Sequence, residues 1–172
     1  GAGKGLGRAI AEKFFSEGAA VVLWDIDFPS AESVAASLDS SGQKTMALKV
    51  DITNETEVGN AVAEVMNRFR RIDILVNVVG GGKPARVAEI TSSEWDDMFS
   101  FNTKSCFLCS REAARRMAAS GGGRIINVAS LAGQTTSVLQ GAHYSASKAA
   151  VIGLTRHMAR ELGPLGIYVN AI

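Results

Sequence analysis

Residues 1–25, GAGKGLGRAIAEKFFSEGAAVVLWD, contain the unit that repeats along the chain, which is a loop or turn, a helix and a strand. The glycine-rich opening runs into a pattern in which Leu6, Ile10 and Phe14 share a helix face, and Gly18 is placed to end that helix. A glycine loop that opens a helix presents backbone N–H groups at the positive end of the helix dipole. The stretch therefore predicts a phosphate-binding site at the start of an α/β fold.

The strand of this first unit ends at a carboxylate. Residues 19–24, AAVVLW, form a short apolar run, and Asp25 follows 18 positions after Gly7. That spacing is close to the ~20 residues that separate a glycine loop from the acid that binds the ribose hydroxyls of NAD. A carboxylate there would repel the 2′-phosphate of NADP, whereas Lys4 weakly favours NADP. We expect NAD in preference to NADP.

Helical and strand patterns alternate along the rest of the chain. Asn54, and Thr91 with Glu94, supply the side chains that begin two of the helices. The alternation predicts a Rossmann-like, doubly wound parallel sheet in three α/β/α layers, formed by one domain over residues 1–172. The expected helices span about 30–40, 54 onward, 91–119 and 144–163, and the expected strands span about 45–50, 72–76, 124–129 and 167–172.

Polar residues follow the predicted strands at their carboxyl ends. Asp25, Asp51, Asn77 and Ser130 all occupy such positions. In open parallel sheets, ligands bind beyond these ends, at a point where the strand order reverses. The pattern predicts a nucleotide site at this edge of the sheet.

The composition limits the possible partners. The 172 residues are 47% hydrophobic and 20% charged, which is typical of a globular protein. Eighteen basic and 17 acidic residues leave a net charge of +1, so we expect a small-molecule substrate and neither nucleic acid nor a membrane. Cys106 and Cys109 lack a second pair that could complete a metal site, and no metal is expected. Without a leader-like or membrane-spanning pattern, we expect a cytoplasmic location.

Tyr144 and Lys148 lie one helical turn apart in the stretch YSASK. Both side chains should therefore project from the same helix face. An ammonium fixed nearby stabilises a phenolate, so Lys148 would allow Tyr144 to exchange a proton near neutral pH. The neighbouring His143 is expected to be exposed near the pocket without a catalytic role, and Trp95 is expected in the core.

With these motifs in order, the sequence resembles the short-chain dehydrogenase/reductase family over essentially its whole length. The glycines at 1, 5 and 7 follow the spacing G-x-x-x-G-x-G. The resemblance rests on GAGKGLG at the start, VDIT around Asp51, NVVG at Asn77, Asn102 in the long helix, NVASLAG around Ser130, YSASK at Tyr144 and VNAI at the end.

The resemblance implies a role for each matching residue. Tyr144 would be the general acid/base, Lys148 would support it and hold the nicotinamide ribose, Ser130 would bind the substrate oxygen, and Asn102 would hold a water that links Lys148 to solvent. The predicted cofactor-binding residues are Gly1, Gly5, Leu6, Gly7, Asp25, Ile26, Asp51, Ile52, Asn77, Gly80, Tyr144 and Lys148.

The chain departs from the family pattern at three places. Val78 and Val79 replace the second Asn and the Ala of an Asn-Asn-Ala-Gly stretch. The family's central strand before the glycine loop and its segment beyond Ile172 have no counterpart here. We expect a piece of a longer enzyme, and we expect residues 1–172 alone to be unstable and inactive.

These motifs leave three functions open. The first is an oxidoreductase that interconverts a secondary alcohol and a ketone with NAD(H). The second is an NADPH-dependent 3-oxoacyl thioester (acyl carrier protein) reductase, which Lys4 would favour and Asp25 would oppose. The third is a non-catalytic nucleotide-binding protein, although Ser130, Tyr144 and Lys148 are all retained. The small and apolar residues around Asn102 are compatible with burial against a second subunit, and the resemblance implies a homodimer or homotetramer.

Overall fold

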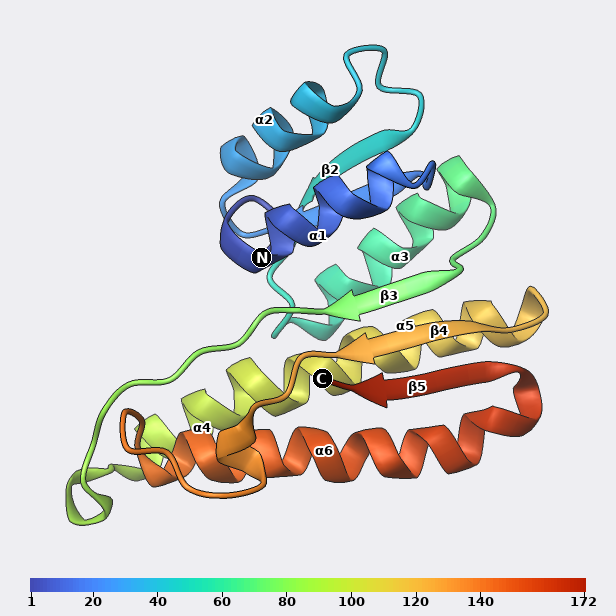
Figure 1. The fold of residues 1–172 in the computed structure, drawn as a ribbon. Coiled ribbons are helices and arrows are strands. Elements are labelled where there is room, and N and C mark those ends of the chain that lie inside the picture. The colour runs from blue at the N-terminus through green and yellow to red at the C-terminus, as the bar shows by residue number, and fades with distance from the viewer. The chain divides into compact units, whose positions relative to one another are not determined.

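The computed structural model describes all 172 residues, and they form two compact units, residues 1–51 and residues 52–172. Each unit has its own sheet, and every strand pairing in both sheets is parallel. Helices and strands alternate along the chain (Figure 1). The predicted parallel α/β architecture is confirmed, whereas the single domain stays a prediction. No helix is both long enough and apolar enough to cross a membrane.

The first unit pairs two strands and packs two helices on them. In order, its elements are α1 (Gly5–Ser16), β1 (Val21–Asp25), α2 (Phe28–Leu38) and β2 (Thr45–Lys49). Gly18, with a φ of +91°, follows the end of α1, as predicted. The core consists mostly of small side chains, which lets the helices lie close to the strands, and its buried members are Ala11, Leu23, Ala31, Val34 and Ala35.

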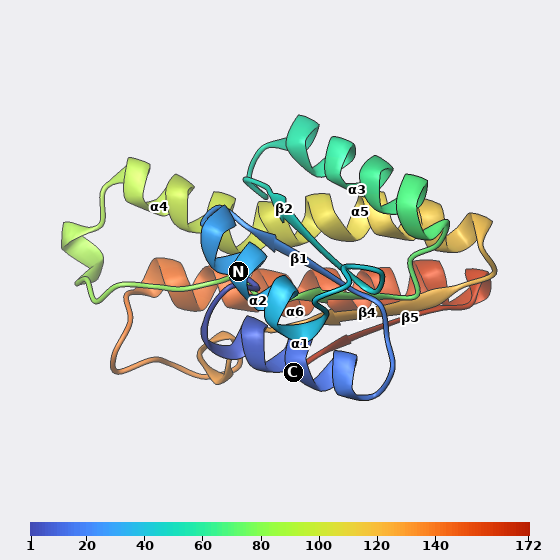
Figure 2. The same ribbon diagram turned by 90° about the horizontal axis from the view of Figure 1, so that it is seen from above.

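The second unit is built on a three-stranded sheet in the order β3-β4-β5. Ile74 pairs with Arg124, and Gly123 pairs with Ile167. α3 packs against α5 (Figure 2). The main elements are α3 (Glu55–Phe69), β3 (Ile74–Asn77), α4 (Ser92–Phe99), a π-helical turn (Ser100–Lys104), α5 (Ser105–Ala119), β4 (Gly123–Asn127), α6 (Ala142–Leu162) and β5 (Ile167–Ala171).

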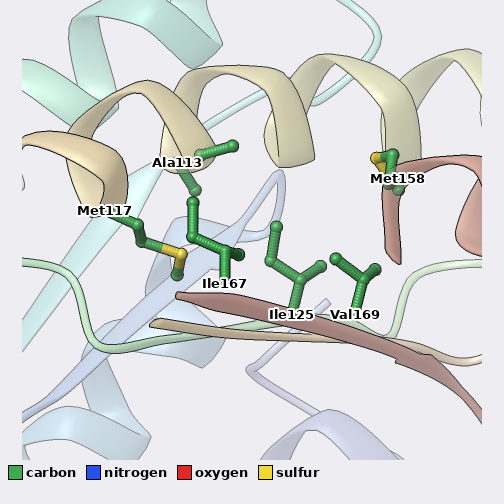
Figure 3. Close-up of a cluster of buried hydrophobic side chains, with 7 residues drawn as sticks. Ala113, Met117, Ile125, Met158, Ile167 and Val169 are labelled. Atoms are coloured by element: carbon green, nitrogen blue, oxygen red, sulfur yellow. The ribbon is translucent and has the colours of Figure 1, made fainter. Parts of the chain in front are cut away.

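The core of the second unit lies between its sheet and two helices. Figure 3 shows Ala113 and Met117 of α5 and Met158 of α6 above the strands, on the side where Ile125, Ile167 and Val169 project. Met117, Ile125 and Ile167 are completely buried. α5 and α6 therefore cover the same face of the sheet, and this packing fixes α6, the helix that carries Tyr144 and Lys148.

Side-chain caps begin two helices as predicted. Asn54 Oδ1 accepts hydrogen bonds from the Thr56 and Glu57 N–H groups at the start of α3. Thr91 and Glu94 form a reciprocal capping box at the start of α4. Both caps satisfy N–H groups that have no partner within the helix.

One expectation about residues 91–119 is confirmed and one is wrong. The segment is helical throughout, as predicted, with a π-helical turn centred on Asn102 between α4 and α5. Trp95 is not in the core, because it is 41% exposed and stacks on Phe99 with 5.1 Å between the ring centroids. The face of α4 that carries Trp95 is therefore partly open to solvent.

Candidate active site

The glycine loop of the first unit leads directly into α1. Gly5 has a φ of +53°, a backbone conformation that favours glycine. A Cβ on Gly7 would lie 2.9 Å from the Gly1 carbonyl carbon, so that position also requires glycine. Lys4 provides no side-chain cap to the helix. The first turn of α1 has no acidic residue and no side-chain cap, so its backbone N–H groups suit a phosphate group.

Asp25, the last residue of β1, is tied to this loop. Its Oδ2 accepts a hydrogen bond from Gly3 N at 2.9 Å, and its Oδ1 accepts one from Asp27 N at 3.0 Å. Partial burial raises the pKa of Asp25, but these backbone hydrogen bonds and the ammonium of Gly1 together hold the pKa below its ordinary value. The carboxylate is therefore charged near neutral pH, and each oxygen can accept a further hydrogen bond.

The other predicted cofactor residues in this part of the chain have different exposures. Leu6 is 56% exposed and Ile26 is 67% exposed, at the start of α1 and directly after β1. Asp51 and Ile52 are partly buried and follow β2. Leu6 and Ile26 are open to a ligand because their side chains take little part in the core.

Lys148 is a buried cation in the second unit. It is 3% exposed, and its Nζ donates a hydrogen bond to the Val128 carbonyl oxygen at 2.8 Å, just beyond β4. Burial lowers the pKa of the Lys148 ammonium below its ordinary value. An ammonium has three donors, so this group can also bind a ligand oxygen. Tyr144 lies one turn earlier on α6 and is partly buried.

The loop after β3 approaches both of these side chains closely. A Cβ on Gly80 would lie 2.5 Å from Lys148 Nζ and 2.9 Å from Asn102 Oδ1. A Cβ on Gly82 would lie 2.6 Å from Cδ2 of the Tyr144 ring. The absence of side chains at Gly80 and Gly82 is what brings this loop against Lys148 and Tyr144.

Asn102 fastens that loop to the helices. Its Oδ1 accepts a hydrogen bond from Gly81 N at 3.0 Å, and its Nδ2 donates to Gly81 O at 2.9 Å. Nδ2 also donates to Ser147 Oγ at 3.0 Å, on the α6 turn between Tyr144 and Lys148. Asn102 is buried and lies in the π-helical turn, where its side chain reaches the loop at Gly81. Its role with a bound water stays a prediction.

Ser130 follows β4 and lies beside α6. Its Oγ accepts a hydrogen bond from Ala132 N at 3.1 Å, which begins a short 3-10 turn, Leu131–Gly133. A Cβ on Gly133 would lie 2.7 Å from the Lys148 carbonyl carbon and 2.7 Å from Ala149 N. The turn therefore packs directly on the helix backbone at Lys148, and the Ser130 hydroxyl keeps its proton available for donation.

Asn77 is directed into a buried polar network. Its Nδ2 donates to Ser110 Oγ at 2.9 Å and to Asn127 Oδ1 at 2.8 Å. Asn127 Nδ2 in turn donates to Thr155 Oγ1 at 2.9 Å. This chain links β3, β4, α5 and α6, and it makes Asn77 a support of the strand ends. Its predicted contact with a cofactor stays a prediction.

His143 is not exposed, contrary to the expectation from the sequence. It is completely buried, and neither ring nitrogen has a hydrogen-bond partner. Oε1 of Gln140, three residues earlier, is also buried and without a partner. The sequence predicted that residues 81–90 and 131–143 contribute to the pocket, but it predicted no individual role for Gln140, Gly82 or Ser147. The run Gly80-Gly81-Gly82 was a visible signal for a close backbone approach, whereas nothing local marked Gln140 or Ser147.

The two cysteines are free and buried on α5. Burial raises the pKa of Cys106 to about 11 and that of Cys109 to about 12. Both thiols are therefore protonated near neutral pH, and they are poor nucleophiles. Ser130, Tyr144 and Lys148 instead provide two hydroxyl groups and one cation at the end of β4 and on α6, and these groups suit proton transfer at an oxygen.

The chain is similar to known proteins along its whole length. The model of a family described as short chain dehydrogenase matches residues 1–172. The NAD-dependent glycerol dehydrogenase of Listeria innocua is 39% identical over 174 residues, and the sorbitol dehydrogenase of Cereibacter sphaeroides is 40% identical over 173. Each alignment covers 100% of this chain and 66% of the relative, so the chain spans about two thirds of their length.

The fold is also similar to that of a solved structure. A solved structure of 7α-hydroxysteroid dehydrogenase, complexed with NADH and 7-oxo glycochenodeoxycholic acid, superposes with a TM-score of 0.93 at 34% identity. The similarity covers 99% of this chain and 66% of that one. The resemblance expected from the sequence motifs is thus confirmed in both sequence and structure, and the chain belongs to the short-chain dehydrogenase family.

Proposed function

We propose that this protein is an NAD(H)-dependent oxidoreductase that interconverts a secondary alcohol and a ketone, with Tyr144 as the general acid/base. The observation that carries the proposal is the buried ammonium of Lys148, held at the Val128 carbonyl oxygen one turn from Tyr144. A cation in a poorly solvated site strongly favours negative charge on a nearby oxygen.

Each residue has a defined task in this reaction. NAD supplies the hydride chemistry when it is bound. During oxidation, Tyr144 Oη removes the proton from the substrate hydroxyl, and Ser130 Oγ donates a hydrogen bond to the same oxygen. Lys148 stabilises the phenolate form of Tyr144 and binds the nicotinamide ribose, while Asn102 and the glycine loop hold these groups in place. In the reverse direction Tyr144 returns the proton to the ketone oxygen.

The first unit would bind the adenosine half of the cofactor. The start of α1 would neutralise the pyrophosphate, with Gly1, Gly5 and Gly7 allowing the close approach. Asp25 would accept hydrogen bonds from the ribose hydroxyls, because its carboxylate is charged and lies at the end of β1. Among the similar proteins, the glycerol dehydrogenase is described as NAD-dependent, and the solved structure contains NADH.

The NADPH-dependent 3-oxoacyl thioester reductase is the less favoured function. Its support in the sequence was Lys4, which would have to bind the 2′-phosphate. Lys4 Nζ instead donates to Asp27 Oδ2 at 2.7 Å, so its charge already has a partner. Comparison of turnover with NAD and NADP separates the two functions, and we expect NAD to be preferred.

The homodimer or homotetramer also remains a proposal. Trp95, Phe101 and Phe107, on the segment from α4 to α5, are each 40–41% exposed. Aromatic side chains are enriched in protein interfaces, so these three support burial of the segment against a second subunit.

Tyr144→Phe in the full-length protein tests the catalytic proposal. Removal of the hydroxyl should lower kcat by about 10²–10⁴-fold, because it removes the proton-transfer group and leaves the ring against Gly82. Binding of NAD, measured by isothermal titration calorimetry, should be nearly unchanged. Near-normal turnover by a variant that binds NAD would overturn the assignment.

A further inference from the structure

The hydroxyl of Ser147 connects two groups of the candidate site. Ser147 lies on α6 just before Lys148 and is completely buried. Its Oγ donates a hydrogen bond to the Tyr144 carbonyl oxygen at 2.8 Å and accepts one from Asn102 Nδ2 at 3.0 Å. The backbone of the proposed acid/base is thus joined to the amide of Asn102 through one buried oxygen.

The direction of these two hydrogen bonds is fixed. A carbonyl oxygen can only accept, so the single hydroxyl proton of Ser147 is directed at Tyr144 O. The lone pairs of Oγ are then left for the amide hydrogens of Asn102. Ser147 therefore requires Asn102 to present Nδ2 to α6, which leaves Oδ1 for the loop after β3.

The loop makes the same demand on the amide. Gly81 N donates to Asn102 Oδ1 at 3.0 Å, and Gly81 O accepts from Nδ2 at 2.9 Å. Each of these partners agrees with one orientation of the amide, as expected for a fully paired buried network. Because Nδ2 bonds both Gly81 and Ser147, Asn102 bridges the loop to α6.

A second hydrogen bond joins the π-helical turn to the same residue. Thr103 Oγ1 donates to the Ser147 carbonyl oxygen at 3.0 Å. Asn102 and Thr103, which are neighbours in the π-helical turn, thus bind the side chain and the backbone of Ser147. Both contacts fall on the turn of α6 between Tyr144 and Lys148.

The loop held in this way is the one that approaches Lys148. A Cβ on Gly80 would lie 2.5 Å from Lys148 Nζ and 2.9 Å from Asn102 Oδ1, so both atoms lie close to one point. An amide oxygen near an ammonium is favourable, whereas an NH2 group turned to the same place would repel it. By holding Nδ2 at α6, the Ser147 hydroxyl keeps the oxygen of the amide near Lys148.

We propose that Ser147 is a positioning residue for the proton transfer at Tyr144. Its hydroxyl joins the Tyr144 backbone to Asn102 and thereby fixes the loop at Gly81 to the turn that carries Tyr144 and Lys148. Because Ser147 is completely buried, it acts through these neighbours and not by contact with a ligand. The inference rests on the proposed oxidoreductase function and adds a residue to the support of the same site.

Ser147→Ala in the full-length protein removes the hydroxyl. With NAD and either 2-butanol or cyclohexanol, kcat should fall by about tenfold, because small displacements of reacting groups lower the rate. KM for NAD should stay within about twofold, which separates lost positioning from lost binding. Ser147→Thr should recover most of kcat, because a threonine hydroxyl can bond the carbonyl three residues earlier in a helix.

Ser145→Ala is the matched control. Ser145 is partly buried on the same turn, and its hydroxyl makes no hydrogen bond. This variant should keep the wild-type kcat. Wild-type kcat in Ser147→Ala would overturn the inference, and so would a folded Ser147→Thr variant that is no more active than Ser147→Ala.

A double-mutant cycle shows whether Ser147 acts through Asn102. If it does, Ser147→Ala should lower kcat little further in a protein that already carries Asn102→Ala. Losses that multiply in the double variant would mean that the two side chains act independently, and they would overturn the inference.

Hydrogen exchange tests the same contact without turnover. The Gly81 N–H should exchange about tenfold faster in Ser147→Ala than in the wild type or Ser145→Ala, because its acceptor on Asn102 is held less firmly. Unchanged exchange overturns the inference. If Ser147→Ala does not fold, Thr103→Val breaks the other bond to Ser147 and should also speed this exchange, and no change there overturns the inference equally.

Tyr144→Phe separates this inference from the proposed function. Near-normal turnover by that variant overturns the proposed function. Loss of its turnover, together with wild-type kcat in Ser147→Ala, overturns only the role of Ser147.

Discussion

Gly80 illustrates how the backbone of this protein makes room for its functional side chains. The loop after β3 passes so close to Lys148 and Asn102 that a single methyl group at Gly80 would overlap both. The buried ammonium and the amide of Asn102 converge on the same backbone position. The φ of Gly80 is not in the left-handed region, so its backbone conformation does not require glycine. The close neighbouring side chains do.

Gly80→Ala should therefore damage both stability and activity. The added Cβ would lie 2.5 Å from Lys148 Nζ, so either the loop or the lysine must move. We expect a loss of about 1–3 kcal/mol in the free energy of unfolding, measured in urea, and a fall in kcat/KM with NAD.

Gly153→Ala is the matched control for this substitution. Gly153 lies on α6 with Lys148, and a Cβ there meets no atom within 4 Å. Alanine should be neutral there or stabilise the helix by up to about 1 kcal/mol. Similar effects of the two substitutions would contradict the close approach at Gly80.

The sequence located the side chains whose partners are close in the sequence. It did not reveal burial that depends on segments distant in the sequence. Tyr144 and Lys148 were found because one helical turn brings them to the same face. Gln140 was given no individual role and His143 was placed at the surface, because the burial of Gln140 Oε1 and of His143 depends on the loop at 82–85. A Cβ on Gly141, for example, would lie 2.7 Å from His143 Nδ1 and 3.2 Å from Ala85 O. Such long-range packing leaves no periodic signal in the sequence.

At the level of elements, the strands and the long helical segment were predictable, and the π-helical turn within that segment was not. Apolar runs and turn residues marked all five strands within a few residues of their observed bounds. The π-helical turn between α4 and α5 was not predicted, because such a turn inserts only one residue into the helical repeat. Its cause is tertiary, since Asn102 binds Gly81 and Thr103 Oγ1 donates to Ser147 O at 3.0 Å.

Glu94, at the start of α4, forms an ion pair with Lys83 in the loop after β3, and this contact should depend on pH. Its Oε1 accepts from Lys83 Nζ at 2.6 Å, and its Oε2 accepts from Thr91 N at 3.0 Å. These hydrogen bonds, chiefly the one from Lys83, lower the pKa of Glu94 to about 2. A depressed pKa means that the carboxylate stabilises the fold above its ordinary pKa of 4.5 and loses that effect as the pH falls toward about 2.

Glu94→Gln should therefore destabilise the protein more near neutral pH than in acid. Urea denaturation of both proteins at about pH 7 and about pH 3 measures the difference in the free energy of unfolding. Glu89→Gln is the control, because Glu89 is exposed nearby and its side chain makes no ion pair in the chain. A difference between wild type and Glu94→Gln that does not change with pH would show that the ionised contact adds nothing.

At the level of the whole molecule, the two compact units differ in their capacity to be stable alone. Residues 1–51 have a two-stranded sheet and a core in which three of the five buried residues are alanine. A sheet of two strands is marginal by itself, and a unit of this size buries a small fraction of its surface. We therefore expect the first unit to unfold only together with the rest of the protein, which is the single domain predicted from the sequence.

Met117→Ala tests this expectation by native-state hydrogen exchange of the full-length protein. Met117 is completely buried in the core of the second unit, so its truncation should cost about 2–5 kcal/mol. If the units unfold together, the slowest amides of β1 around Leu23 and of β4 around Ile125 should lose protection by the same free energy. Arg116→Ala, at an exposed neighbour on α5, should change neither. Loss of protection in β4 alone would show that the two units unfold as separate domains.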